Sequence, residues 1–253
     1  MNTMTDTHSI RLASYNIRKC VGLDMRRRPN RILSVINGLE ADVVALQEAD
    51  RRFGNRPSAL PARLIEDETD FRVVPLDSNG ASLGWHGNAI LVRKEMPVSD
   101  QTRLELPGTE PRGAVSITIN NGVRVTATHL GLRRSDRRRQ SAEIVAHLKN
   151  GALPSVIIGD MNEWSPTRGL EPLSGSYRLL SPGRSFHAAR PIAALDRVAL
   201  SQLLENTDAG VVDTPKSRMA SDHLPIWIDF RLASKTLGVD QKQPQNHEET
   251  CAD

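Results

Sequence analysis

Ser155-Val-Ile-Ile-Gly159, followed at once by Asp160-Met161-Asn162, is the stretch of this sequence that decides the fold. A short run of β-branched residues closed by glycine is typical of a strand buried on both faces. Polar side chains placed directly after such a strand lie at the sheet edge where layered α/β proteins keep their sites. The stretch therefore predicts an α/β fold with its functional residues at strand ends.

The same kind of apolar segment recurs along the chain. Further strands are predicted at residues 10–15, 42–47, 89–93, 115–119, 123–129, 195–200 and 226–231. Asn120-Asn121-Gly122 predicts a hairpin turn between two of them. Since helical segments alternate with the strands, the order predicts sheets whose faces are covered by helices.

Two helices are predicted from apolar residues at helical spacing. Pro29 can open the first, because apolar residues recur at i, i+3, i+4 and i+7 from Ile32. Ser135 can cap the second, which is expected to end at Gly151. The apolar face of the second helix is predicted to be Ala142, Val145 and Leu148.

The composition indicates one folded domain. The chain has 253 residues, of which 38% are hydrophobic and 25% charged, and this excludes collagen-like, coiled-coil and mostly disordered proteins. We expect a flexible segment at 1–9, one domain over 10–232, and a disordered tail at 233–253, where apolar residues are almost absent. No transmembrane segment is predicted, because the apolar runs fall far short of the roughly 20 residues that a spanning helix needs.

The cysteines and the first residues bear on location. Cys20 and Cys251 are the two cysteines, too few for a disulfide framework in a chain of this size. The first ten residues are polar and show no secretory signal. We therefore expect a cytoplasmic protein, and a monomer by default.

Polar residues lie at or near the ends of several predicted strands. They are Asn16, Glu48, His129, Asp160, Asn162, Asp196, Asp222 and His223. Carboxylates are hard oxygen donors that suit Mg²⁺ or Mn²⁺ better than a thiolate zinc site. A divalent metal beside carboxylates and histidines can hydrolyse phosphoesters. The motifs GxxxxGK[ST] and GxGxxG are absent, which argues against kinases and dinucleotide enzymes.

These residues lie in motifs that resemble those of the endonuclease/exonuclease/phosphatase superfamily, in the same order along the chain. The motifs are Tyr15-Asn16-Ile17, Leu46-Gln47-Glu48, Thr128-His129-Leu130, Gly159-Asp160-Met161-Asn162, Leu195-Asp196-Arg197-Val198 and Ser221-Asp222-His223-Leu224-Pro225. The chain is most similar to small bacterial members of this group. The resemblance implies a four-layer α/β/β/α sandwich, in which two sheets pack face to face with helices outside.

The resemblance also implies metal ligands. Glu48 would bind the divalent ion, Mg²⁺ or Mn²⁺, and Asn16 would help to hold metal and phosphate. Asp222 would lie near a second metal position. These residues are the expected metal site.

The resemblance further implies catalytic roles. Asp160 would polarise the attacking water, and Asn162 and His129 would contact phosphate oxygens. His223 would stabilise the charge at phosphorus. Asp196 would orient His223 by accepting its other N–H, an arrangement that fixes the tautomer of a histidine.

The chain departs from the abasic-site endonucleases of the superfamily at two places. Arg18 stands where those enzymes have aspartate, and Thr128-His129 stands where they carry a tyrosine motif. Abasic-site repair is therefore disfavoured. Asn88, Arg133 and Arg18 are the residues that we expect to bind substrate.

Arginine clusters suggest an anionic, phosphate-containing substrate. One cluster is Arg26 to Arg28 with Arg31, and the other is Arg133, Arg134 and Arg137 to Arg139. Both follow site-bearing strands, so they could line the rim of a cleft and attract nucleic acid, or they could be solvated surface. Aromatic residues make up only 4% of the chain, which favours a small phosphoester over stacked bases.

Three functions remain open from the sequence. The first, and the one that we favour from the sequence, is a Mg²⁺-dependent phosphodiesterase or nuclease that uses metal-activated water. The second is a phosphatase or phosphodiesterase that acts on a lipid or small-molecule phosphoester. The third is an inactive binding module, which the intact set of site residues argues against.

Overall fold

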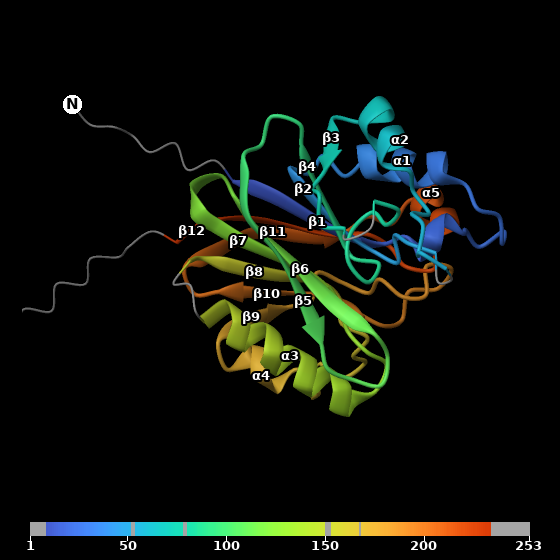
Figure 1. The fold of residues 1–253 in the computed structure, drawn as a ribbon. Coiled ribbons are helices and arrows are strands. Elements are labelled where there is room, and N and C mark those ends of the chain that lie inside the picture. Colours follow the sequence, from blue (N-terminus) through green and yellow to red (C-terminus); the bar gives the residue numbers. More distant parts are fainter. Residues whose placement is uncertain (1–8, 52–53, 78–79, 150–152, 167, 234–253) are drawn as a thin grey trace, which may run out of the picture.

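Two six-stranded sheets packed face to face form the centre of the computed structural model (Figure 1). The structure describes residues 9–51, 54–77, 80–149, 153–166 and 168–233. In spatial order, the first sheet contains β11 (Leu204–Val211), β12 (Ile226–Leu232), β1 (Ile10–Asn16), β2 (Val43–Gln47), β4 (Ala89–Arg93) and β3 (Phe71–Val73). The second contains β5 (Val98–Leu106), β6 (Arg112–Ile119), β7 (Val123–His129), β8 (Ser155–Asp160), β10 (Asp196–Ser201) and β9 (Tyr177–Leu180).

Each sheet has one parallel strand pair at its centre. In the first sheet β1 runs parallel to β2, and in the second β7 runs parallel to β8. Every residue of β2 and β8 is buried, as expected for strands covered on both faces. The polar residues at the ends of these strands are thereby fixed on a rigid centre.

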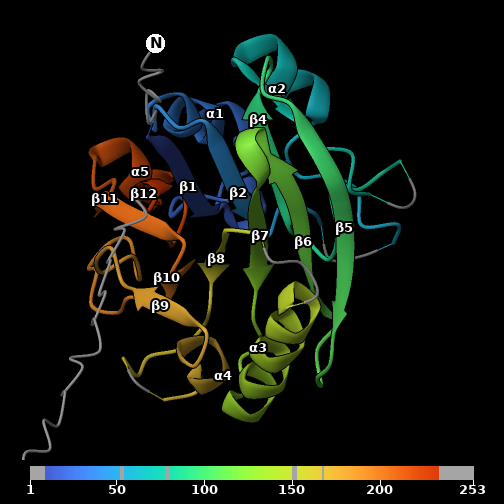
Figure 2. The same ribbon diagram turned by 90° about the vertical axis from the view of Figure 1, so that its left-hand side faces the viewer.

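Helices cover the outer face of each sheet (Figure 2). The first sheet carries α1 (Pro29–Asn37), α2 (Ala62–Glu68) and α5 (Pro215–Ala220), and the second carries α3 (Arg134–Lys149) and α4 (Glu171–Ser174). Short 3₁₀ turns occupy Arg18–Cys20 and Asn120–Gly122. The predicted four-layer α/β/β/α sandwich is confirmed.

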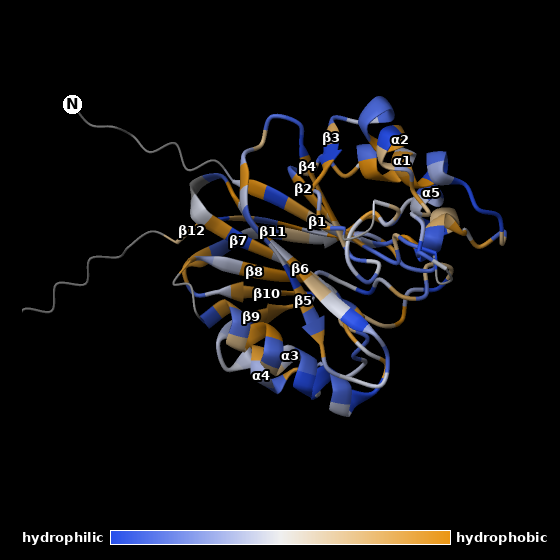
Figure 3. Cartoon of the chain, in the orientation of Figure 1, coloured by the Kyte–Doolittle hydropathy of each residue, from blue (hydrophilic) through white to orange (hydrophobic). Residues whose placement is uncertain are grey.

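Three apolar cores hold the layers together. Leu12, Val43, Val125 and Val156 belong to the core between the two sheets, whereas separate cores lie beneath α1 and beneath α3. Figure 3 shows the hydrophobic residues concentrated in the strands and hydrophilic residues on the outer helices. No helix in the described part of the chain is long and apolar enough to cross a bilayer.

The second predicted helix needs correction. It begins at Arg134, one residue before the expected cap Ser135, and Ala142 is exposed rather than buried. Ile144 takes its place on the buried face beside Val145 and Leu148. The difference arises because α3 also buries polar residues, so its contact face does not follow the apolar pattern alone.

Some sequence predictions fall outside the described residues. The predicted helix end at Gly151, the segment 1–8, the tail 234–253 and Cys251 all belong to this group. The predictions of flexible ends therefore stay predictions.

Candidate active site

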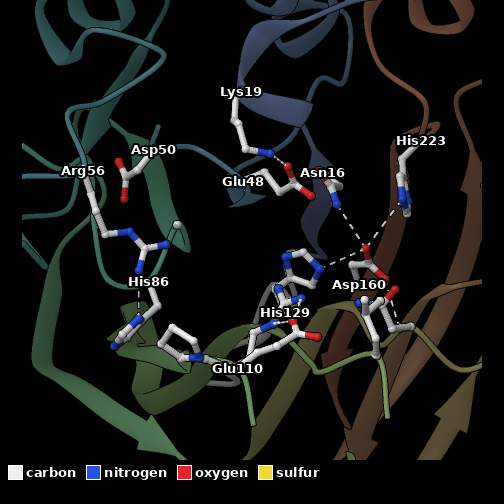
Figure 4. Close-up of a pocket in the computed structure, with 15 residues that line it drawn as sticks. Asn16, Lys19, Glu48, Asp50, Arg56, His86, Glu110, His129, Asp160 and His223 are labelled. Carbon is white, nitrogen blue, oxygen red and sulfur yellow. Dashed lines mark hydrogen bonds and ion pairs between the residues drawn. The ribbon is translucent and has the colours of Figure 1, made fainter. Parts of the chain in front are cut away.

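The ends of the central strands meet in a pocket of about 550 Å³ (Figure 4). Asn16 ends β1 and Glu48 directly follows β2, both in the first sheet. His129 ends β7 and Asp160 ends β8, and these two residues are register partners in the second sheet. All four line the pocket, as does Asn162.

Gly159 allows β8 to deliver Asp160 to this position. Its φ of +151° lies outside the range that other residues favour, and a Cβ atom there would lie 1.9 Å from the carbonyl oxygen of Thr128. A side chain at Gly159 would thus push β8 away from β7. The Gly-Asp-Met-Asn motif therefore needs glycine at its first position so that β8 can pack against β7.

The carboxylate of Asp160 is the centre of the site. Its Oδ2 accepts a hydrogen bond from Asn16 Nδ2 at 3.0 Å and faces Nε2 of His129 at 3.4 Å and of His223 at 3.6 Å. Its Oδ1 accepts the backbone N–H of Asn162 at 2.9 Å. Asp160 is only 1% exposed, so these contacts set its chemistry.

His223 is held as a cation between two carboxylates. It follows α5 in the chain, and its Nδ1 donates to Asp196 Oδ2 at 2.8 Å. Burial opposes the charged form, but Asp196, Asp160 and Asp222 outweigh it and raise the pKa of His223 to about 10. His223 therefore carries a proton at neutral pH that Nε2 can present to the pocket.

His129 has the opposite charge state. Burial lowers its pKa to about 3, because the attraction of Asp160 does not compensate for the loss of solvent. The ring is neutral at physiological pH. The pocket thus combines one neutral and one protonated histidine on either side of a single carboxylate.

Glu48 and Asn16 offer oxygen atoms to a divalent metal. The ammonium group of Lys19 contacts the Glu48 carboxylate, which shows that this carboxylate faces a position suited to a cation. Carboxylate and amide oxygens in a pocket fit Mg²⁺ or Mn²⁺. These two residues therefore fit the metal that the sequence predicts.

A second cluster of possible metal ligands is less accessible to an ion. Ligand atoms of Asp160, Asp196 and His223 all lie within 4.8 Å of one another. However, Asp196 Oδ2 already accepts from Ser185 Oγ at 2.5 Å and from His223, and Asp196 does not line the pocket. We interpret Asp196 as a residue behind the pocket that orients His223.

Besides Asp196, four predicted residues lie outside the pocket lining. Asp222 pairs with Arg18 at 3.4 Å. Asn88 is fully buried, and its Nδ2 donates to the carbonyl oxygens of Trp85 and Gly113. Arg133 is exposed. The roles of Asp222, Arg18, Asn88 and Arg133 in binding metal or substrate stay predictions.

The arginine clusters do not line the pocket either. Among the described residues that line it, none belongs to the two clusters. Several cluster members instead pair with carboxylates of the protein, namely Arg31 with Asp24, Arg134 and Arg137 with Glu163, Arg138 with Glu171, and Arg139 with Asp136. The hypothesis of a basic rim built from these clusters therefore lacks structural support.

Other polar and charged side chains of the pocket were not predicted from the sequence. Lys19, Arg56, His86 and Arg112 line it, together with the carboxylates of Asp50 and Glu110. Lys19 could have been found, because it lies three residues after Asn16 in the same loop. Arg56 and His86 lie in connecting segments without a motif, so no local pattern singles them out.

Comparison with known proteins relates the fold and the motifs to one family. A model of the Endonuclease/Exonuclease/phosphatase family matches residues 13–223. Uncharacterized protein YbhP of Escherichia coli K12 is 27% identical over 255 residues, covering 92% of this chain and 100% of that protein.

Solved structures are similar in fold. A mannosyl-6-phosphatase of Bacteroides thetaiotaomicron has a TM-score of 0.68 at 16% identity, and D. rerio TDP2 with a single-strand DNA product has 0.68 at 14%. Both comparisons cover 88% of this chain and 99% of the other. At these identities the likeness concerns the fold.

Proposed function

Because the chain belongs to the endonuclease/exonuclease/phosphatase family, whose members hydrolyse phosphoesters, we propose that it is a divalent-metal-dependent phosphoester hydrolase with its reaction centre at Asp160. The observation that carries the proposal is the Asp160 carboxylate, which lies between Asn16, neutral His129 and protonated His223 in one pocket. This arrangement offers a base, a proton donor and neutral hydrogen-bond donors around one position. Such a set suits an in-line attack of water on phosphorus.

The residues around Asp160 have proposed roles in the reaction. Asp160 accepts a proton from the attacking water, and His223 stabilises the negative charge that develops on the phosphate oxygens. Asn162 and His129 hold the phosphate in place through neutral donors. Asp196 keeps the ring of His223 in one orientation through the 2.8 Å hydrogen bond to Nδ1.

The metal would be held by Glu48 and Asn16. When bound, Mg²⁺ or Mn²⁺ supplies Lewis-acid stabilisation of the charge on phosphate. Asn16 also donates to Asp160, so it links the two halves of the site. We retain the expectations of a cytoplasmic location and a monomer.

A compact phosphoester is the substrate class that the pocket favours. Its volume of about 550 Å³ falls in the range of small-molecule sites. Several members of the arginine clusters, which favour nucleic acid, pair with carboxylates of the protein instead. The fold of the mannosyl-6-phosphatase is compatible with this class.

A nuclease is the second candidate, and one exposed aromatic residue favours it. Trp164 is 61% exposed and makes an edge contact with Phe186, whose ring packs against His223 at 4.9 Å between centroids. An exposed tryptophan that is separated from His223 by one aromatic ring can stack on a nucleobase. The fold of TDP2 with single-strand DNA is compatible with this function.

A comparison of wild type with His223→Ala tests the proposal. The substrates are 4-nitrophenyl phosphate, bis(4-nitrophenyl) phosphate, mannose 6-phosphate and supercoiled plasmid, each with Mg²⁺, Mn²⁺ or EDTA. We expect metal-dependent turnover of a small ester that falls roughly 10²–10⁴-fold in the variant, because a transition-state contact is lost. His147→Ala, on α3 and outside the pocket lining, is the matched control and should keep wild-type turnover.

The other outcomes are equally informative. Plasmid nicking that His223→Ala abolishes, without turnover of the small esters, would replace the first candidate by the nuclease. Turnover that survives in His223→Ala would contradict the assignment of the site. No turnover by wild type, with metal binding still detected by calorimetry, would indicate an inactive binding module.

A further inference from the structure

The pocket has a second charged end, opposite the Asp160 centre. Figure 4 shows Arg56 and His86 on one side of the pocket and Asp160 and His223 on the other, with Glu48 between them. None of the catalytic steps above uses Arg56 or His86. Both nevertheless line the same continuous cavity as Asp160.

Arg56 differs from the other pocket cations in its partners. Lys19 pairs with Glu48, and Arg112 pairs with Glu110 at 2.7 Å. Within the described part of the chain, no carboxylate lies within 4.0 Å of the Arg56 guanidinium. Its Nε atom is buried without a hydrogen-bond partner, which is costly for a charged donor.

His86 holds the guanidinium in place. Arg56 Nη1 donates to His86 Nδ1 at 3.0 Å, so this nitrogen carries a lone pair and the ring proton is on Nε2. His86 Nε2 in turn faces Glu105 at 3.1 Å, and the ring contacts Trp85 edge-on at 4.8 Å. The imidazole is therefore fixed from two sides and adds no counter-charge to Arg56, and the carboxylate of Asp50 on the same side of the pocket (Figure 4) accepts its hydrogen bonds from Ser82 and Leu83.

The backbone of this end resembles that of the reaction centre. Glu48 and Asn162 have positive φ values of 51° and 50°, and Arg56 and His86 have the same unusual conformation, at 49° each. Non-glycine residues rarely adopt it, and those that do concentrate at functional sites. Both ends of the pocket thus hold their side chains at a conformational cost.

We infer that Arg56, positioned by His86, forms a subsite for a second phosphate group of the substrate. The inference rests on the proposed function, since the first phosphate is the one attacked at the Asp160 centre. A guanidinium presents parallel N–H donors that match phosphate oxygens, and a phosphate would supply the missing counter-charge. The substrate class is then a compact molecule with two phosphate groups.

Calorimetric binding of phosphonates tests the subsite. The full chain in Mg²⁺ buffer is titrated with alkane-α,ω-bisphosphonates of increasing length and with alkyl monophosphonates of the same lengths, at constant ionic strength. Their C–P bonds are not hydrolysed as phosphoesters are, so the binding is read independently of turnover. We expect one chain length whose bisphosphonate binds about tenfold tighter than its monophosphonate, the effect of one charge-assisted contact.

Variants assign that preference to Arg56. Arg56→Gln should abolish the advantage of the second phosphonate, whereas Arg56→Lys, which keeps the charge without the fork, should retain part of it. Arg63→Gln, on the exposed face of α2, is the matched control and should keep the full advantage. Equal affinity of both ligands at every length, or an advantage that survives in Arg56→Gln, would overturn the inference.

The subsite and the proposed reaction can fail separately. Turnover of small phosphoesters without a bisphosphonate preference would leave the proposed function standing and remove the subsite. A preference that depends on Arg56, in a chain without turnover, would keep the subsite and remove the reaction.

Discussion

Asp160 and Glu163 are buried carboxylates only three residues apart, yet their surroundings differ completely. Glu163 accepts short hydrogen bonds from Arg137 at 2.7 Å, from Arg134 at 3.0 Å and from the backbone of Ser165 at 2.9 Å. Asp160 faces two histidines at 3.4 and 3.6 Å and borders the pocket. A carboxylate that two arginines neutralise holds structure together, whereas one that faces histidines and borders a pocket can take part in a reaction.

The Glu163 cluster ties together the loops that flank the site. Arg137 also donates to the carbonyl oxygen of Leu132 at 2.6 Å, and Arg197 donates to the carbonyl oxygen of Glu163 at 2.7 Å. Leu132 follows β7 and lines the pocket. The cluster therefore supports the pocket from behind without entering it.

Asp160→Asn should have the largest effect on activity. The substitution keeps the shape of the side chain but removes the base, so turnover should fall roughly 10²–10⁴-fold. The melting temperature should stay close to that of wild type. Steady-state kinetics and calorimetric melting provide the measurements, with the exposed Asp67→Asn as control. Retained turnover would remove Asp160 from the reaction.

Glu163→Gln should have the opposite profile. It leaves the buried guanidinium of Arg137 without its counter-charge, which costs about 3–5 kcal/mol of unfolding free energy. Turnover per folded molecule, measured well below the melting temperature, should change little. Denaturant unfolding is compared with Glu205→Gln, whose half-exposed pair with Arg231 should cost about 1 kcal/mol or less. Similar losses of unfolding free energy in Glu163→Gln and Glu205→Gln would contradict the structural role assigned to Glu163.

Glu48→Gln should weaken metal binding more than it changes any other property of the protein. The loss of one carboxylate ligand should raise the Mg²⁺ concentration needed for half-maximal activity roughly 10–100-fold. Glu110→Gln removes another pocket carboxylate, one that pairs with Arg112, and should shift the requirement much less. An unchanged Mg²⁺ requirement in Glu48→Gln would show that Glu48 is not a ligand of the metal.

The smallest expected effect is a pH dependence of stability. Burial alone would raise the pKa of Glu163, but Arg134, Ser165 and Arg137 outweigh it and lower the pKa to about 2. Since the ordinary value is 4.5, the contribution of this carboxylate is complete above that pH and is lost as the pH falls toward 2.

Melting curves from pH 7 to pH 2 test this dependence. The difference in melting temperature between wild type and Glu163→Gln should be largest at neutral pH and should shrink through this acidic window. A difference that stays constant over the whole range would show that Glu163 does not titrate as described.

The buried strands were predictable, whereas the edge strands were not. Segments 89–93 and 123–129 were predicted with the bounds that the structure shows, because continuous apolar runs indicate buried strands. The strand Val98–Leu106 alternates polar residues at a sheet edge, and Leu204–Val211 contains an irregularity between Asn206 and Asp208. Neither of these strands has the apolar run that identifies the central strands of the sheets.

The centre of the site was likewise easier to predict than its surroundings. Strand ends and motifs pointed to Asp160, His129 and His223, which the structure brings together. The arginines of α3 were read as a basic rim, because sequence alone does not show that Arg137 meets Glu163. Arg56 reaches the pocket through tertiary folding of a connecting segment, and no local pattern encodes this.

The order in which the chain enters the two sheets has a consequence for the timing of activity. His223 immediately precedes β12, the last strand of the described chain, and β12 inserts between β11 and β1. Asp196 belongs to the second sheet, so the hydrogen bond from His223 to Asp196 joins the segment before β12 to the other sheet, and we expect it to form late in folding. A nascent or partly folded chain would hold Glu48 and Asp160 but no proton donor. In the proposed reaction, hydrolysis would then begin only after β12 has been synthesised and packed, and its onset would report this late step of folding.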